Sequence, residues 1–272
     1  MRPNSLMLLL ASFAALSAAS RAQDPRQIVQ QAVQTELAAD RDDHSHWLYF
    51  ETDRQPQKNV KEWVAEAQTA SLKRIVSRNG QPVPQAEQRS ELDRFIHDSA
   101  AQAKQHKNGA HDDAQAAELL KILPNAFIWT KREEKGSDTI LHFTPDPQFR
   151  PPDLEARVFA AMEGDMAVDT AQHRIVSLKG RLIRDVKFGY GLFGELKAGG
   201  TFDVERREIG SRLWQITETH VHIEGHALLF KNISEEEDDE KFQFKPLPAN
   251  ISLQEAETQL LDQGNPQLSR AR

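Results

Sequence analysis

The chain has 272 residues, of which 39% are hydrophobic and 28% charged, with 13 glycines, 13 prolines and no cysteine. This composition supplies enough apolar material for one packed domain and excludes a collagen-like or wholly disordered chain. The lack of cysteine excludes disulfides, thiol chemistry and an acylated N-terminal cysteine. The formal net charge of −7 argues against nonspecific binding to nucleic acid or to anionic lipid headgroups.

The first 22 residues have the three-part pattern of an export signal. Arg2 precedes an apolar stretch over residues 6–19, and the small residues Ser20 and Ala22 follow it. This stretch is shorter than the roughly 20 apolar residues that a membrane-spanning helix needs. We therefore expect residues 1–22 to be a signal peptide that is cleaved after Ala22, which places the mature protein in the periplasm.

The mature chain begins with a helical pattern, since Asp24 is a good N-cap and Pro25 fits the first helical position. From residue 42 the pattern changes to β, with a short apolar and aromatic strand over residues 47–50. Residues 60–76 fit a helix in part and strands in part. We interpret them as two strands joined near Thr69 and Ala70.

A polar helical insertion is expected over residues 85–123. Its first part, 85–107, is helix-favouring with few large apolar residues, so it predicts an exposed helix. A loop is expected at Asn108 and Gly109. A second helix is then expected over residues 112–123, ended by Pro124.

From residue 126 to residue 245 the sequence predicts an antiparallel meander, because turn residues separate short β patterns. A hairpin joins residues 126–134 to residues 139–144. Further strands are expected at 157–162, 166–169, 174–182, 185–190, 201–208, 213–224 and 228–233. The six consecutive acidic residues 235–240 predict a solvated loop, with a calcium site as the weaker alternative. The tail, 249–272, has one helical pattern around residues 253–261.

A sheet of this length must close or curl to hide its edges and its apolar face. The predicted fold is therefore mainly β, in the α+β class. We expect a strongly curved antiparallel sheet or half-open β-barrel, with helices covering its concave side. Residues 23–248 are expected to form this single domain.

Common signatures of enzymes are missing from the sequence. It contains no Gly-Xaa-Ser-Xaa-Gly elbow, phosphate-binding loop, dinucleotide fingerprint or His-Glu-Xaa-Xaa-His helix. The glycine-rich stretch 189–194 lacks the strand-to-helix context of a nucleotide loop and predicts a bend in a curved sheet. We therefore expect a protein that is not an enzyme and that uses no cofactor.

One group of side chains suits a metal ion. Four potential ligands alternate along one predicted strand and would share a face: His220, His222, Glu224 and His226. Imidazole and carboxylate ligands suit zinc or copper. The alternative, which we favour, is that this is the solvent face of a sheet whose other face carries Val221 and Ile223.

Large aromatic residues on predicted strands are either core residues or the lining of a cavity, and the sequence does not separate these roles. The candidates for a ligand-binding cavity are Trp47, Tyr49, Phe127, Trp129, Phe188, Tyr190, Phe193 and Trp214.

Several segments resemble a known group of proteins. They are residues 123–127 (Leu-Pro-Asn-Ala-Phe), 143–152, 162–169 (Met-Glu-Gly-Asp-Met-Ala-Val-Asp), 180–186, 188–191 and 199–202. Together they resemble largely uncharacterised exported bacterial proteins that are similar to the outer-membrane lipoprotein-sorting superfamily of LolA, LolB and RseB type. The likeness covers roughly residues 42–244. It implies a half-open barrel with helices as a lid, enclosing an apolar cavity that receives the acyl chains of lipoproteins.

We therefore expect a periplasmic, non-enzymatic binding protein that holds a lipid or lipidated ligand by an acyl chain, and the resemblance implies a role in outer-membrane lipoprotein sorting. Burial of an acyl chain contributes about 0.8 kcal/mol per methylene group, so no specific polar contact is needed. The first alternative is an envelope signalling or scaffold module that binds a protein partner. The second is a metal-binding protein that uses the face from His220 to His226. Neither a nucleic-acid partner nor a membrane span is expected after cleavage.

Overall fold

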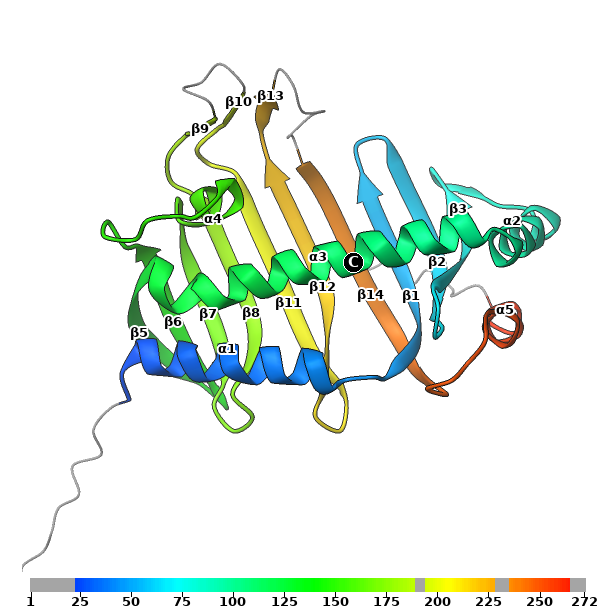
Figure 1. The fold of residues 1–272 in the computed structure, drawn as a ribbon, viewed down its shortest axis with the longest axis horizontal. Coiled ribbons are helices and arrows are strands. Elements are labelled where there is room, and N and C mark those ends of the chain that lie inside the picture. Colours follow the sequence, from blue (N-terminus) through cyan, green and yellow to red (C-terminus); the bar gives the residue numbers. More distant parts are fainter. Residues whose placement is uncertain (1–22, 189–193, 228–234, 265–272) are drawn as a thin grey trace, which may run out of the picture.

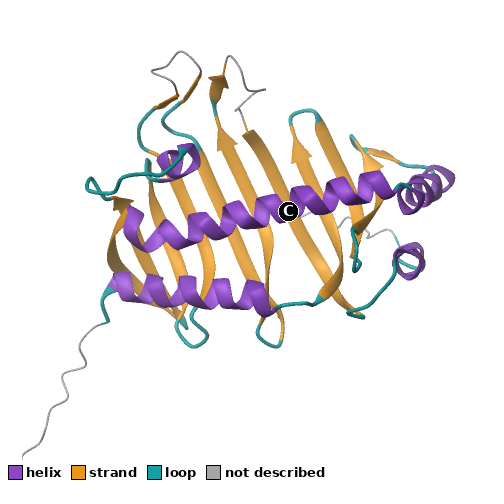
Figure 2. Ribbon diagram, viewed as in Figure 1, coloured by secondary structure: helices purple, strands orange, loops and turns teal. Residues whose placement is uncertain are grey.

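The computed structural model describes residues 23–188, 194–227 and 235–264. Its main element is an open antiparallel sheet of 11 strands, with helices α1 and α3 lying across one face (Figures 1 and 2). The strand order is β4-β3-β2-β1-β14-β12-β11-β8-β7-β6-β5. The predicted fold, a mainly β structure with an open curved sheet and helices over one face, is confirmed.

The helices are α1 (Pro25–Asp42), α2 (Gln85–His97), α3 (Ser99–Ala126), α4 (Leu154–Phe159) and α5 (Leu253–Leu261). The strands of the main sheet are β1 (His46–Gln55), β2 (Lys58–Glu66), β3 (Ser71–Arg78), β4 (Gln81–Pro82), β5 (Phe127–Lys135), β6 (Asp138–Pro145), β7 (Met162–Asp169), β8 (Arg174–Leu182), β11 (Thr201–Gly210), β12 (Leu213–Ile223) and β14 (Glu235–Leu247). A separate small sheet, β9 (Val186–Phe188), β10 (Gly194–Leu196) and β13 (Gly225–Ala227), extends beyond one end of the main sheet (Figure 1).

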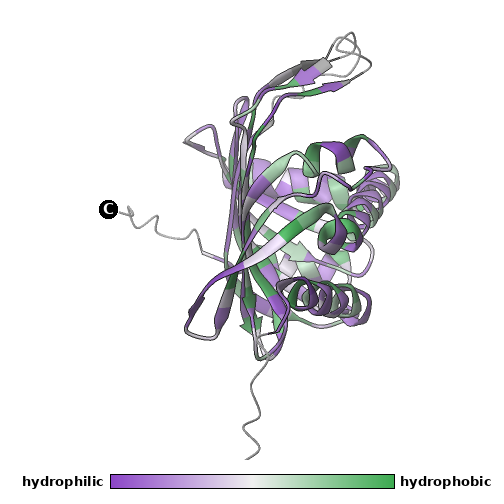
Figure 3. Ribbon diagram, turned by 90° about the vertical axis from the view of Figure 1, so that its left-hand side faces the viewer, coloured by the Kyte–Doolittle hydropathy of each residue, from purple (hydrophilic) through white to green (hydrophobic). Residues whose placement is uncertain are grey.

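Helix α1 begins where the sequence predicts. The Asp24 side chain accepts a hydrogen bond from the backbone N–H of Arg26, and Pro25 occupies the first turn. Its buried side chains include Val29 and Ala32, which pack on strands β5 to β8 in the largest core cluster. Helices α1 and α3 lie on the same side of the sheet, which Figure 3 shows edge-on. We call this side of the sheet the inner face.

Strand β1 is buried on both faces, unlike the strands in the middle of the sheet. Leu48 and Phe50 point to the outer face, where side chains of α2 and α5 cover them in a second core cluster. Trp47 and Tyr49 point to the inner face and form a third, smaller cluster. This double coverage explains the continuous apolar run of β1, since a half-exposed strand would alternate.

The sheet is continuous between β12 and β14 over a short stretch only. Residues 218–223 of β12 pair with residues 235–240 of β14. On its other side, β12 pairs with β11 along most of its length, and β14 pairs with β1 from Asp238 to Leu247. Outside residues 218–223 and 235–240, the described residues of β12 and β14 do not pair with each other. Trp47 lies close to Gly210 and packs with Leu213 and Phe244 between the diverging strands. The sheet therefore consists of two wings joined by six residue pairs.

The predicted loop at Asn108 and Gly109 is wrong, because α3 runs through both residues as one helix of 28 residues. A turn signal of two residues is a weak local preference. Its flanks are rich in alanine and other helix-forming residues, which outweigh it. The predicted end at Pro124 is also too early, since α3 continues to Ala126.

Two further sequence predictions are corrected. Of residues 157–162, predicted as a strand, 157–159 end helix α4, 160–161 form a turn and Met162 begins β7; Asp153 caps α4 by accepting a hydrogen bond from Ala156 N–H. The acidic run 235–240, predicted as a solvated loop, begins the central strand β14. Several of its charges are paired from both faces, for example Glu240 with Arg54 and Asp239 with Lys241, which reduces the repulsion within the run. The predicted strand 228–233 and most of the glycine-rich stretch lie outside the described residues.

Candidate functional site

The predicted aromatic lining is divided between separate clusters. Phe127 and Trp129 stack edge to face with ring centres 5.9 Å apart in the largest core cluster. Trp47 and Tyr49 are buried in the small cluster at the split between the wings. These four side chains therefore fill protein cores, which the sequence could not distinguish from a cavity lining.

Trp214 is half-buried on the inner face of β12. Its Nε1 donates a hydrogen bond to Gln172 Oε1 at 3.1 Å, and the Arg174 guanidinium lies 5.8 Å from its ring centre. Of Phe188 only the backbone, in β9, is described, and Tyr190 and Phe193 lie outside the described residues.

The histidines of β12 lie on the outer face. His220 Nδ1 is 2.7 Å from Asp238 Oδ1, and this hydrogen bond raises the pKa of His220 above its ordinary value. His222 is largely exposed, with Nε2 3.6 Å from Glu224 Oε1. Glu224 follows the end of β12, and of His226 only the backbone is described. The described part of the chain holds no group of three potential ligands with the geometry of a metal site.

Helix α3 crosses the inner face but buries few of its own side chains. Its buried residues, Leu123, Pro124 and Ala126, all lie in the last turn. Near its other end, Gln105 accepts a hydrogen bond from Ser71 N–H at 2.8 Å and donates one to Ser71 O at 3.0 Å. Residues 99–122 are exposed or half-buried. The helix is thus held by its last turn, by its packing against α1 and by Gln105, and it crosses the middle of the sheet without a buried side chain.

Strands β11 and β12 present apolar side chains to the inner face in this middle region. Arg206 of β11 points to the inner face, because its side chain pairs with Glu36 of α1. Ile216 of β12 lies directly opposite Arg206 and therefore points to the same face. Val204 and Val221 share this face. Val204, Ile216 and Val221 belong to none of the three core clusters, and we call them the central patch.

The exposure of the central patch identifies it as a surface that the chain itself does not cover. Ile216 is 42% exposed although it lies on the inner face, and Val204 and Val221 are half-buried. Single exposed apolar residues are common, whereas apolar residues on a concave face beneath a helix are candidates for ligand contact. The sequence analysis named Val221 only as part of the face opposite the histidines, and it did not single out Val204 or Ile216, because their spacing is that of any strand.

Beside the central patch, strands β14, β1, β2 and β3 carry a network of charges on the inner face. Lys73 Nζ lies 2.7 Å from Glu62 and 3.0 Å from Glu51. Burial raises the pKa of Glu62, whereas for Glu51 the opposing effect of burial is outweighed by Lys73 and Lys241, which lower its pKa. These charges pair with one another. Next to them, the central patch is a part of the inner face that is apolar and not covered by the described part of the chain.

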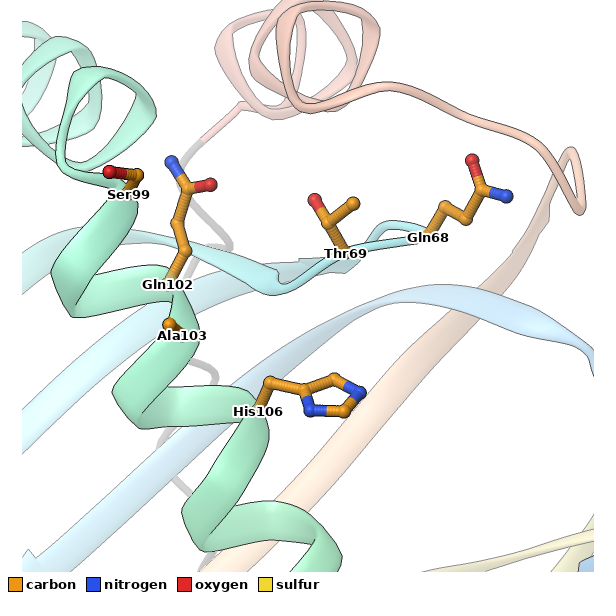
Figure 4. A pocket seen from close by; sticks show the side chains of 6 residues that line it. All are labelled: Gln68, Thr69, Ser99, Gln102, Ala103 and His106. Carbon is orange, nitrogen blue, oxygen red and sulfur yellow. The ribbon is translucent and has the colours of Figure 1, made fainter.

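Two of the pockets on the described surface can be compared with the predicted lining. The first, of about 380 Å³, lies between the β2–β3 turn and the first turns of α3, and is shown in Figure 4. Its lining residues are Gln68, Thr69, Ser99, Gln102, Ala103 and His106. The second, of about 230 Å³, is lined by Thr201, His220, Val221, His222, Glu236 and Asp238. Neither contains any of the predicted aromatic residues.

Comparisons of the chain with models of protein families, with curated proteins and with solved structures find no match. The class of site is therefore defined by geometry. It is an apolar patch on the inner face of an open sheet, crossed by a helix and flanked by paired charges.

Proposed function

We propose that the protein is a non-enzymatic binding protein that holds a lipid or lipidated ligand by an acyl chain on the central patch, between α3 and strands β11 and β12. The single observation that carries this proposal is the 42% exposure of Ile216 on the face that α3 crosses. Together with the signal-like N-terminus, it supports a carrier of the periplasm that takes part in outer-membrane lipoprotein sorting.

The driving force is the removal of apolar surface from water on both partners. Each buried methylene of the ligand contributes about 0.8 kcal/mol. The nearest charged side chains already have ion-pair partners within the protein, because Arg206 is paired with Glu36 and Lys241 with Asp239. An acyl chain therefore gains stabilisation along the patch without leaving a buried charge unpaired.

The first test uses protein purified without detergent. Native mass spectrometry is expected to detect bound lipid, and a fluorescent fatty acid is expected to bind and to be displaced by palmitate. A spectrum of the protein alone together with no uptake of the probe contradicts the proposal. A co-purified protein that added fatty acid does not displace would instead support an envelope scaffold.

The second test places a charge in the patch. Ile216→Arg is expected to weaken binding of the fluorescent fatty acid by about tenfold or more, which corresponds to about 1.4 kcal/mol. The matched control is Gln215→Arg, because Gln215 is the next residue on the same strand and pairs with Arg207, whose side chain contacts Glu218. Equal binding by the wild type and Ile216→Arg, with both folded by circular dichroism, contradicts the proposal.

A further inference from the structure

Two aspartates oppose each other inside the protein. In the antiparallel pair of β1 and β14, Asp53 is directly opposite Asp239, and each residue is 8% exposed. Cβ atoms of directly opposed residues lie about 4.5–5.5 Å apart, and like charges in this arrangement are destabilising. The Oδ1 atom of each residue is buried and accepts no hydrogen bond. Native structures leave few buried polar atoms unsatisfied, so this pair needs a further partner.

The surrounding charges do not supply that partner. Asp53 is paired with Lys58 through its other oxygen, and Asp239 Oδ2 lies 3.0 Å from Lys241. Three lysines serve the four carboxylates of this network, because Lys73 pairs with both Glu51 and Glu62. Among these groups, the carboxylates therefore outnumber the lysines by one. The titratable groups that face the aspartates are Tyr49, Glu51, Lys58, Glu62, Lys73, Glu237 and Lys241.

A proton can supply the missing positive charge beside Asp53 and Asp239 more readily than a larger cation can. Both free Oδ1 atoms are covered from solvent, so a metal ion or an ammonium ligand would have to displace the lysines to reach them. A proton needs no such access. A protonated carboxyl can donate one hydrogen bond to a carboxylate opposite it, which would give the orphan oxygens a partner and remove one negative charge.

We propose that Asp53 and Asp239 share one proton and form a buried acid–carboxylate pair that makes the junction of β1 and β14 sensitive to pH. Burial raises the pKa of Asp239 most strongly. The negative charges of Glu51 and Asp53 raise this pKa further, whereas Lys241 lowers it. A raised pKa means that the folded state binds the proton more tightly than the unfolded state. This stabilisation is complete below the ordinary pKa of an aspartate and is lost as the pH rises through the folded-state value.

The first experiment needs no variant and follows the carboxyl groups of the full chain by infrared and ¹³C NMR spectroscopy during a pH titration. We expect a carboxylic-acid band that persists at pH values where ordinary aspartates are ionised, and two titration steps separated by more than about one pH unit. The proposal is overturned if both aspartates are ionised at neutral pH and titrate near ordinary values.

The second experiment assigns the proton. Asp53→Asn and Asp239→Asn each remove one member of the pair and offer an amide donor to the other, so each is expected to abolish the persistent band. Each is also expected to flatten the fall of the urea midpoint that the wild type shows as the pH rises above the ordinary pKa of an aspartate. Glu240→Gln is the matched control, since Glu240 is the next residue on β14, faces outward and pairs with Arg54. A band that persists in both asparagine variants overturns the proposal. None of these outcomes depends on the binding of an acyl chain.

Discussion

Glu36 of α1 and Arg174 of β8 form a doubly hydrogen-bonded ion pair in the protein interior. Arg174 Nε donates to Glu36 Oε1 at 3.0 Å, and Nη2 donates to Oε2 at 2.9 Å. Their side chains are only 4% and 7% exposed. Glu36 also accepts the backbone N–H of Ile175 at 2.7 Å and pairs with Arg206. The carboxylate therefore ties α1 to two strands of the sheet beside the central patch.

Removing this carboxylate charge is expected to destabilise the fold. Glu36→Gln leaves the positive charge of Arg174 buried without a counter-charge, and loss of one partner of a buried pair costs about 3–5 kcal/mol. Urea unfolding at neutral pH measures this loss. The control is Asp40→Asn on the exposed side of the same helix, which is expected to change stability by less than about 0.5 kcal/mol. Similar values for the two variants would show that the pair is not stabilising.

The pair of Glu36 and Arg174 is also expected to make the free energy of unfolding decrease at low pH. Burial disfavours the charged form of Glu36, but the hydrogen bonds and charges of Arg174 and Arg206 outweigh it and lower its pKa below the ordinary value. A lowered pKa gives stability that is present above the ordinary pKa and is lost as the pH falls through the folded-state value. Below pH 4.5, the ordinary value for a glutamate, wild-type stability is therefore expected to fall more steeply than that of Glu36→Gln.

Two opposed glycines on β7 and β8 are expected to differ in their tolerance of alanine. A Cβ on Gly164 would overlap the carbonyl oxygen of Lys179, whereas a Cβ on Gly180 would meet the ring of Phe202 at 2.6 Å. Backbone cannot move aside as a side chain can, so Gly164→Ala should destabilise more than Gly180→Ala. A double-mutant cycle checks the cause, because the cost of Gly180→Ala should shrink in a Phe202→Ala background. An unchanged cost would contradict the contact.

The middle of α3 is expected to gain stability from a single methyl group. Nothing lies within 4 Å of a Cβ built on Gly109, and helix interiors favour alanine over glycine by about 0.5–1 kcal/mol. Thermal or urea unfolding of Gly109→Ala should show a gain of this size. Gly136→Ala is the control of opposite sign, because the φ of +64° at Gly136 strains any other residue. A destabilised Gly109→Ala would argue for a break in the helix at this point.

His220 should retain its proton at a higher pH than an ordinary histidine. Its pKa is raised first by the hydrogen bond to Asp238, which outweighs partial burial. Such a shift gives stability that is present below the ordinary pKa and is lost as the pH rises through the folded-state value. An NMR titration should show the shift, and Asp238→Asn should lower the pKa of His220. Glu224→Gln, which alters the neighbour of His222, should leave the pKa of His220 unchanged.

Local signals predicted the elements that neighbouring residues determine. The interpretation of residues 60–76 as two strands is confirmed by β2 and β3, which are joined by the turn that contains Thr69 and Ala70. The helix around residues 253–261 is confirmed as α5, whose Ser252 and Glu255 form a capping box. In both cases the information lies within a few residues of the element.

Features that depend on distant partners were predicted poorly. The acidic run was predicted as a loop because its pairing residues, Arg54 and His220, come from other strands. The central patch was missed for the same reason, since the exposure of Ile216 depends on the path of α3. An aromatic side chain such as Trp129 satisfies the pattern of a cavity wall and of a packed core equally well, and here it belongs to a core.

The union of the two wings over six residue pairs has a consequence for their cohesion. The β14 half of this union is the acidic run itself, so the most densely charged segment of the chain is also the one that keeps the sheet in one piece. Within each wing, most of the packing is between apolar side chains. Because charged side chains line the union of the wings, their attachment should respond to salt and acidity more strongly than the apolar cores within each wing do.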